Sequence, residues 1–296
     1  MRIAINTDFC NGLPIEDCLR EIAAAGFASL LWGHHWNDDF LYSGVEIQAI
    51  RGMLKRFGLE LLDLHGSAGQ EKCWFSTVEY ERLAGVELVR NRLRMFGELA
   101  GRGVLVMHTP AIRSTTPPEE IPRIWQRVEA LKRSLDELLP EAERCQCPIA
   151  IENHPRGSWQ VLNALFDAYP SPWFGLCYDS GHGHVPGGSD QLAMLNARKN
   201  RLLAIHLHDN DSSMDQHQPP GFGTLDWGPV LTAIAESSYR NEALFEVRID
   251  KTPFCPANGT PRLPEGRAFL ADAATRGATI AAMLEEKRAR GKSLQG

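Results

Sequence analysis

The sequence predicts one α/β domain, a (β/α)8 TIM barrel that spans residues 1–296. Short apolar runs alternate with longer amphipathic stretches along the whole chain, and no linker or low-complexity segment interrupts them. No hairpin dipeptide joins consecutive strands, so each strand leads into a helix and pairs in parallel through it. Eight such repeats average about 37 residues, which suits a closed barrel of about 250 residues with modest loop insertions.

The predicted elements alternate strictly. Eight strands are expected at Arg2–Asn6, Ser29–Trp32, Leu59–His65, Val104–His108, Pro148–Asn153, Trp173–Asp179, Leu202–His208 and Ala243–Arg248. The helices are expected at Pro14–Ala25, Val45–Phe57, Val78–Gly101, Glu119–Arg144, Trp159–Tyr169, Ser189–Asn200, Asp226–Ser238 and Glu265–Glu286. Gly26, Gly58 and Gly101 follow the first three helices, where a left-handed C-cap suits glycine. Asp226 is the expected N-cap of the seventh helix.

Composition and charge exclude several other classes. With 43% hydrophobic and 23% charged residues, the chain is typical of a folded soluble protein. Its formal charge of −6 argues against a protein that mainly binds nucleic-acid phosphates, because that affinity comes from a positive surface. An open doubly wound sheet is the alternative fold. It would need a glycine-rich phosphate loop after the first strand, and residues 7–12 (TDFCNG) do not form one.

The expected location is the cytoplasm. The first residues lack the apolar run of a signal peptide, and no segment approaches the ~18 apolar residues of a membrane span. The seven cysteines are odd in number and contain no C-x-x-C pair, so we expect reduced thiols. The sequence leaves the oligomeric state open, a homo-oligomer included.

Side chains that bind metals recur at the C-terminal ends of six successive predicted strands. They are His65, His108, Glu152, Asp179, His206 and Glu246. In a barrel these ends meet on the face where active sites are built. Carboxylates and imidazoles crowded at one mouth repel or stay unpaired unless a cation gathers them, so the pattern predicts a metal site.

Two Asp/His pairs and the segment His206-Leu207-His208 extend this pattern. Asp179 and His182 are three residues apart in a glycine-containing turn, and Asp215 and His217 form a second pair after strand seven. In His206-Leu207-His208 both imidazoles face the same side of an extended strand. We expect His206 to be the ligand, whereas His208 either supports the ligands or contacts the substrate.

Four segments resemble the xylose-isomerase-like TIM-barrel superfamily. They are residues 151–154 (IENH), 178–182 (YDSGH), 205–211 (IHLHDND) and 215–227 (DQHQPPGFGTLDW), and the resemblance extends over nearly the whole chain. That superfamily contains sugar and sugar-phosphate isomerases and epimerases, inosose dehydratases, and metal-dependent abasic-site endonucleases. The joint pattern indicates the superfamily and does not specify the reaction.

The resemblance implies roles for individual residues. The epimerase pattern of one divalent ion held by Glu, Asp, His and Glu falls on Glu152, Asp179, His206 and Glu246, and His182 falls on a position that contacts a substrate hydroxyl. The endonuclease pattern holds three zinc ions. The additional ligands of that pattern fall on His65, His108, His182, Asp215 and His217.

The expected function is a metal-dependent isomerase or epimerase acting on a small carbohydrate. Glu152 and Glu246 are the predicted acid–base pair for moving a proton next to a carbonyl, and the metal stabilises the enediolate. Hard oxygen ligands favour Mn²⁺, with Mg²⁺ or Co²⁺ as alternatives, whereas occupied additional histidines favour Zn²⁺. A dehydratase or lyase needs the same proton abstraction. The endonuclease is the remaining alternative, opposed by the acidic balance.

Three further residues are candidates for substrate contact. Arg248 lies two residues after Glu246, where it binds a phosphate or hydroxyl of the substrate or pairs with a carboxylate at the rim. Trp32 ends the second predicted strand, and the loop 33–36 (GHHW) that follows is interpreted as a lid or pocket wall. His208 completes this set. No nucleic acid or membrane is expected as a partner.

Overall fold

The computed structural model describes residues 1–293 and contains eight strands. The strands are β1 (Ile3–Asn6), β2 (Ser29–Trp32), β3 (Glu60–His65), β4 (Leu105–Met107), β5 (Ile149–Glu152), β6 (Phe174–Asp179), β7 (Leu202–His206) and β8 (Ala243–Phe245). They form one parallel sheet in the order β7-β6-β5-β4-β3-β2-β1-β8. Leu207 and Leu244 close the ring through an N–H···O bond of 2.9 Å. The predicted (β/α)8 barrel is therefore confirmed.

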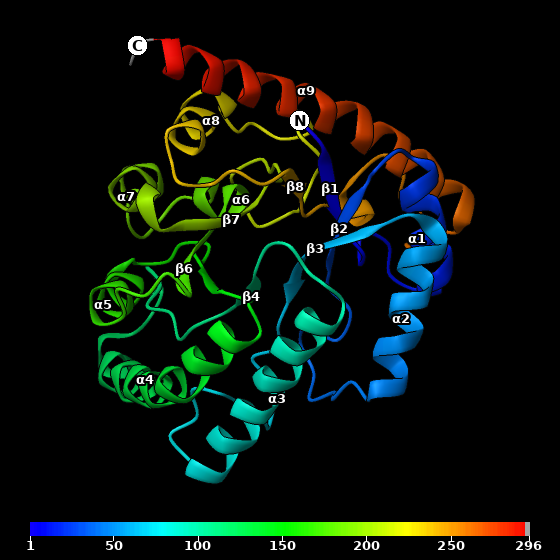
Figure 1. The fold of residues 1–296 in the computed structure, drawn as a ribbon. Coiled ribbons are helices and arrows are strands. Elements are labelled where there is room, and N and C mark those ends of the chain that lie inside the picture. Colours follow the sequence, from blue (N-terminus) through cyan, green and yellow to red (C-terminus); the bar gives the residue numbers. More distant parts are fainter. Residues whose placement is uncertain (294–296) are drawn as a thin grey trace.

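Helices surround the barrel (Figure 1). They are α1 (Ile15–Ala24), α2 (Gly44–Phe57), α3 (Glu79–Glu98), α4 (Ile121–Arg144), α5 (Gln160–Ala168), α6 (Ser180–His184), α7 (Gln191–Arg198), α8 (Trp227–Ala235) and α9 (Leu263–Ser293), with short 3-10 turns at Pro118–Glu120, Lys199–Arg201 and Ile249–Lys251. The long α9 lies beside β1 and the N-terminus (Figure 1). None of the helices in residues 1–293 is both long and apolar enough to cross a membrane.

Several predicted bounds were wrong in detail. The seventh strand ends at His206 rather than His208, and the last helix spans Leu263–Ser293 rather than Glu265–Glu286. The last strand ends at Phe245 rather than Arg248, because the Val247 amide donates to the Asn6 side chain at 2.9 Å instead of continuing a ladder. The one-turn helix α6 was not predicted. It begins directly after Asp179, whose carboxylate accepts from the His182 amide at 2.6 Å.

The predicted helix caps are mostly confirmed. Gly26 and Gly58 adopt left-handed φ values of 92° and 66°, and the Asp226 carboxylate caps α8 by accepting from an amide in its first turn. The cap at Gly101 was wrong, because Ala100 takes the left-handed conformation with φ 55°. Glycine is needed at 101 for another reason: a Cβ there would lie 2.4 Å from the Phe96 ring.

Small apolar side chains fill the barrel below its C-terminal mouth. The cluster consists of Val104, Val106, Ala150, Cys177 and Ala204, all buried. Four of them stand two residues before His108, Glu152, Asp179 or His206. Because residues two apart on a strand face the same side, those polar groups also point into the barrel, one layer higher. The interior is packed apolar below and polar at the mouth.

Candidate active site

The polar side chains predicted at the strand ends line one cavity at the C-terminal mouth. The cavity has a volume of about 480 Å³ and is lined by Asn6, Asp8, Trp36, His65, His108, Glu152, His182, Asp215, His217, Glu246 and Arg248. Asp179 and His206 lie fully buried beneath it. The barrel thus brings together residues that are more than 180 positions apart in the chain, from His65 to Glu246.

The centre of the mouth is a tight group of four residues. One ligand atom from each of Glu152, Asp179, His206 and Glu246 lies within 4.8 Å of the others. The Nδ1 atom of His206 is 2.8 Å from Glu152 Oε1 and 2.8 Å from Glu246 Oε2. Two carboxylates therefore converge on one buried imidazole nitrogen.

Glu152 also belongs to a second group, with two histidines from the neighbouring strands. Its Oε2 atom lies 2.9 Å from His108 Nε2 and 3.7 Å from His65 Nε2. The side chain of Glu152 is 1% exposed. Each of its two oxygens consequently faces a different set of imidazoles, so this carboxylate can bridge two ligand groups.

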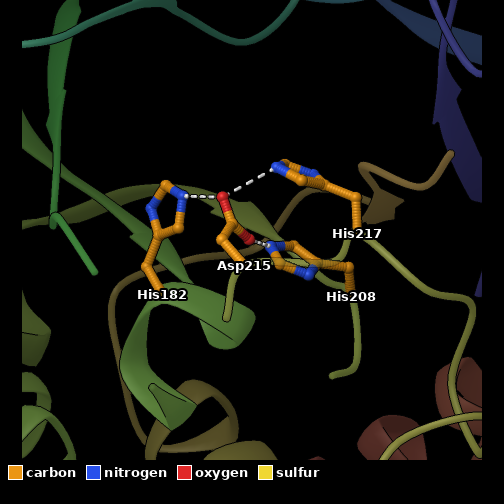
Figure 2. A group of neighbouring side chains, drawn as sticks. All are labelled: His182, His208, Asp215 and His217. Carbon is orange, nitrogen blue, oxygen red and sulfur yellow. Dashed lines mark hydrogen bonds and ion pairs between the residues drawn. The ribbon is translucent and has the colours of Figure 1, made fainter. Parts of the chain in front are cut away.

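A third group lies on the other side of the mouth and includes the long loop after β7. Figure 2 shows Asp215 between the rings of His182, His208 and His217. Asp215 Oδ2 is 3.1 Å from the Nε2 atoms of both His182 and His217, and the His208 ring stacks on His217 with centroids 4.1 Å apart. These four residues offer ligand atoms within 4.8 Å of one another.

Electrostatics keep the carboxylates of the mouth ionised. Burial alone would raise the pKa of Glu246, but His206 and His217 outweigh burial and hold that pKa well below its usual range. Burial likewise would lower the pKa of His217, yet Asp215 and Glu246 raise it to about 9. Carboxylate and imidazolium thus stabilise each other, and a divalent cation can supply the same positive charge in place of protons.

The donor set fits a divalent metal ion. The Nε2 atom of His206 and the Oδ1 atom of Asp215 are buried without a hydrogen-bond partner among the described residues. Buried polar atoms are normally satisfied, and unpartnered ones at a site call for an ion or water. Carboxylate oxygens mixed with imidazole nitrogens are ligands that Mn²⁺, Co²⁺ and Zn²⁺ accept.

Residues next to the ligands hold them in place. The Asn153 amide donates to the Asp179 carbonyl at 3.0 Å and accepts from the Asp179 amide at 2.7 Å. His208 Nε2 lies 2.9 Å from Asp179 Oδ1. In the loop after β7, Asp209 accepts from the amides of Gly221 at 2.8 Å and Leu225 at 3.0 Å. These contacts fix the β6 end and the loop that carries Asp215.

Two of the four predicted substrate contacts lie at the cavity and two do not. His182 and Arg248 line it, and Arg248 also pairs with Asp250 at 2.9 Å. His208 is 0% exposed and is engaged with Asp179, so it supports a ligand rather than reaching the cavity. Trp32 is 3% exposed and lies behind the cavity wall, where its Nε1 donates to Tyr42 Oη at 2.9 Å.

Sequence reasoning missed two residues of the cavity lining, Asn6 and Asp8. Asn6 ends the first strand, so the strand-end pattern would have included it had amides been counted with carboxylates and imidazoles. Asp8 follows two residues later and accepts from the Asn6 side chain at 2.9 Å. The predicted pocket wall, residues 33–36, does contribute Trp36 to the lining, whereas Trp32, the residue predicted to contact the substrate, does not line the cavity.

Comparison with known proteins gives matches over most of the chain. Residues 19–273 match the family described as "Xylose isomerase-like TIM barrel". An uncharacterized protein named y4fM from Sinorhizobium fredii is 30% identical over 261 residues, which covers 80% of this chain and 82% of that protein. An inosose dehydratase of Clostridium tetani is 24% identical over 271 residues, with 83% and 84% covered.

Solved structures show the same fold. The crystal structure of a D-tagatose 3-epimerase-like protein superimposes with a TM-score of 0.72 at 19% identity, and the match covers 98% of this chain and 99% of the other. At that identity the likeness concerns the fold alone.

Proposed function

Because the chain belongs to the xylose isomerase-like TIM barrel family, we propose that it is a metal-dependent isomerase or epimerase acting on a small carbohydrate. The observation that carries the proposal is the convergence of Glu152, Asp179, His206 and Glu246 within 4.8 Å at the barrel mouth. Relatives by sequence and by fold include an inosose dehydratase and a D-tagatose 3-epimerase-like protein. Both names describe proteins of carbohydrate chemistry.

Glu152, Asp179, His206 and Glu246 would hold the ion, and Mn²⁺ suits this set of three carboxylates and one imidazole best. Zn²⁺, Co²⁺ and Mg²⁺ are the alternatives. When bound, a divalent cation polarises the substrate carbonyl and lowers the free energy of the negative charge that develops on its oxygen. The groups His65/His108 and His182/Asp215/His217 would take additional ions or contact the substrate.

Glu152 and Glu246 are the proposed acid–base pair. They come from β5 and from the residue after β8, and both are ionised, which is the form that accepts a proton. One carboxylate takes the proton from the carbon next to the carbonyl. The other, after taking up a proton from solvent, delivers it to the same or the neighbouring carbon, and the first then releases its proton to solvent. Return to the same carbon from the opposite side is an epimerisation, and return to the neighbour is an isomerisation.

The substrate is proposed to bind against the remaining cavity residues. His182 and Arg248 donate to hydroxyls, and Asn6 and Asp8 extend the polar wall at the end of β1. Arg248 is the only permanent cation in the lining, and Asp250 already pairs with it. This charge balance of the cavity lining suits an uncharged carbohydrate better than nucleic acid. The proposed location of the enzyme is the cytoplasm.

A dehydratase on the same site is the first alternative, because a 24% identical relative carries that name. Loss of water begins with the same proton abstraction and needs an acid for the leaving hydroxyl. His182 lines the cavity 3.1 Å from Asp215. Although burial lowers the pKa of this imidazole, Asp179 and Asp215 raise it above its usual range, so His182 can serve as that acid. Product analysis separates the two reactions, since only the dehydratase releases a compound 18 Da lighter.

A metal-dependent endonuclease is the second candidate, and one specific observation favours it. All nine residues of the three-ion pattern lie at the mouth. The His65/His108 group shares Glu152 with the central group, and the His182/Asp215/His217 group adjoins the central group where His182 lies 3.8 Å from Asp179. The acidic balance and the lack of a basic cavity lining oppose this reading. One ion per chain after purification in metal-limited buffer supports the carbohydrate enzyme, whereas three zinc ions and cleavage of abasic DNA overturn it.

The decisive experiment follows proton transfer directly. The purified protein with Mn²⁺ is incubated in D2O with ketoses and cyclic keto-polyols, and deuterium incorporation next to the carbonyl is measured. We expect exchange with the wild type and at least a hundredfold slower exchange with Glu246→Gln. Glu242→Gln, at the opposite end of the barrel, is the matched control. Unchanged exchange in both Glu152→Gln and Glu246→Gln contradicts the two-carboxylate mechanism.

A further inference from the structure

One wall of the cavity is a loop, residues 33–43, that connects β2 to α2. Its residue Trp36 lines the cavity. The Trp36 ring lies 5.3 Å from the His65 ring and 5.7 Å from the His108 ring, measured between centroids. An indole ring therefore covers the side of the mouth where these two histidines face Glu152. It is the large apolar surface of a lining that is otherwise made of charged, imidazole and amide groups.

Two consecutive residues of α3 hold this loop through its backbone. Asn91 Oδ1 accepts from the Tyr42 amide at 2.9 Å, and Asn91 Nδ2 donates to the Tyr42 carbonyl at 2.8 Å. The Arg92 guanidinium donates to the carbonyls of Phe40 at 2.9 Å and His35 at 3.3 Å, and it stacks over the Tyr42 ring at 4.6 Å. Both ends of the stretch that carries Trp36 are thus bonded to α3.

Arg92 is an unusual buried cation. It is 0% exposed, and it forms no ion pair with a carboxylate in the described part of the chain. Arg82 on the same helix is also buried, at 3% exposed, but pairs with Glu79 at 2.7 Å and with Glu137 at 2.9 Å. A buried charge without a counter-ion is costly unless its hydrogen bonds are satisfied. Both terminal nitrogens of Arg92 donate to loop carbonyls, whereas its Nε has no hydrogen-bond partner among the described residues. The burial of Arg92 therefore depends on this one loop conformation.

Further contacts fix the same loop. Trp32 Nε1 donates to Tyr42 Oη, and Tyr42 Oη donates to the His34 carbonyl, both at 2.9 Å. On the side of the β3 loop, the Asp39 carboxylate accepts from the amides of Gln70 at 2.9 Å and Glu71 at 3.0 Å. The loop is consequently held from β2, from α3 and from the next loop along the barrel.

We propose that Trp36 is a specificity-determining residue that packs against the C–H face of a carbohydrate, and that Arg92 is the positioning residue that sets it there. The inference rests on the proposed carbohydrate function and names the substrate class further: a sugar or cyclic polyol with several C–H bonds on one face. Such a face is apolar, and an indole ring offers it a large rigid contact area. The hydroxyls of the other face then point to the polar residues of the cavity.

Kinetics of single and double variants test the proposal. Trp36→Ala is expected to raise KM about tenfold with kcat changed less than about threefold, and Trp36→Phe to restore most of the loss. Arg92→Met keeps the apolar stem of the side chain and removes the guanidinium, and it is expected to raise KM similarly. In the Trp36→Ala/Arg92→Met double variant the two effects do not add, because Arg92 acts through Trp36.

The controls separate positioning from general stability. Arg82→Met removes an equally buried arginine of the same helix and is expected to leave KM unchanged. Hydrogen exchange of residues 33–43 should accelerate in Arg92→Met and not in Arg82→Met, with metal affinity the same in both. If Arg92→Met does not fold, Asn91→Leu replaces it in the same measurements. Additive KM effects, or a loop whose exchange is unchanged, overturn the role of Arg92.

Failure of this inference is distinguishable from failure of the proposed function. A wild type that turns over a carbohydrate, with KM unchanged in Trp36→Ala, overturns the roles of Trp36 and Arg92 and leaves the proposed function standing. A wild type that neither turns over nor binds any sugar or polyol, by calorimetry with Mn²⁺ present, overturns both. The preference for a substrate with an apolar C–H face is tested by comparing cyclic keto-polyols with open-chain ketoses of the same size. Equal loss of affinity for both in Trp36→Ala contradicts the preference for a C–H face.

Discussion

The two ends of the barrel both carry clusters of charged side chains, but the clusters are built differently. At the N-terminal end, Arg2 and Arg102 pair with Glu60 and Glu242 through N···O distances of 2.9 Å for Arg2–Glu60, 2.9 Å for Arg102–Glu60 and 2.6 Å for Arg102–Glu242. Two guanidinium groups balance two carboxylates. Arg2, Glu60 and Arg102 are at least 39% exposed, so water also screens the charges.

The C-terminal mouth has no such internal balance. Glu152, Asp179, Asp215 and Glu246 are gathered around histidines, and the arginine of the lining is engaged by Asp250. Their charge is neutralised only by protons on imidazoles or by a bound cation. The comparison teaches that arginines balance the carboxylates of the N-terminal cluster, whereas imidazoles balance those of the mouth, where the proposed divalent ion would supply the same positive charge. This division agrees with the separation of stability and activity in TIM barrels.

The largest effect is expected from Glu152→Gln at the mouth. This substitution removes the carboxylate that lies against His65, His108 and His206, and with it the proposed base and a bridging ligand. We expect kcat/KM to fall by about 10³-fold or more. Steady-state kinetics with the substrate found by deuterium exchange measure the loss. Retention of more than a tenth of the wild-type activity contradicts the assignment.

Removal of the metal is expected to have the next largest effect. A ligand at 100 to 1,000 times its Kd stabilises the native state by about 3–4 kcal/mol. Dialysis against a chelator should therefore lower Tm by about 5–6 °C, and added Mn²⁺ should restore it. The same treatment of a Glu152→Gln/Asp179→Asn variant is the control. A wild-type Tm that does not respond to chelator or metal argues against an ion at the mouth.

Asp63 is a buried carboxyl between the two ends of the barrel, and we expect it to make the free energy of unfolding depend on pH. Burial raises the pKa of this carboxyl from 3.8 to about 7, while its bond from the Val104 amide at 2.7 Å opposes that shift. A pKa that is higher in the folded state favours folding at low pH. That stability is present below about pH 4 and is lost as pH rises to about 7, at up to about 1.4 kcal/mol per pH unit.

Asp63→Asn should remove this decline, because the amide oxygen can still accept from Val104 and carries no charge. Urea unfolding at several pH values measures this decline, with Asp17→Asn, at a partly exposed position of α1, as the control. If Asp63→Asn loses stability between pH 4 and 7 as steeply as the wild type, Asp63 does not cause the decline.

The smallest effect is expected at the N-terminal end. Glu242→Gln weakens the pairs with Arg2 and Arg102 and should lower the free energy of unfolding by about 1–2 kcal/mol. Activity should stay within about twofold of the wild type, because this cluster lies at the opposite end from the cavity. Denaturant unfolding and kinetics on the same sample check both statements. A large loss of activity with unchanged metal affinity would show that the two ends are coupled.

The sequence by itself determined the architecture and most of the mouth. Alternation of apolar runs and amphipathic stretches predicted all eight strands, since each needs only a local pattern that buries one side of a helix or both sides of a strand. The position of a residue at a strand's C-terminal end also follows locally. That is why His65, His108, Glu152, Asp179, His206 and Glu246 were found without a structure.

Only the tertiary structure decided which of these residues meet and which neighbours reach the cavity. Trp32 and Trp36 are four residues apart, but only Trp36 lines the cavity. Arg92, more than 50 residues away in the sequence, holds residues 33–43 in the one conformation that places Trp36 there. His208 faces Asp179 rather than the cavity because Gly181 leaves room for its ring, where a Cβ would lie 1.8 Å away. Such contacts depend on packing between distant segments, for which a local pattern carries no signal.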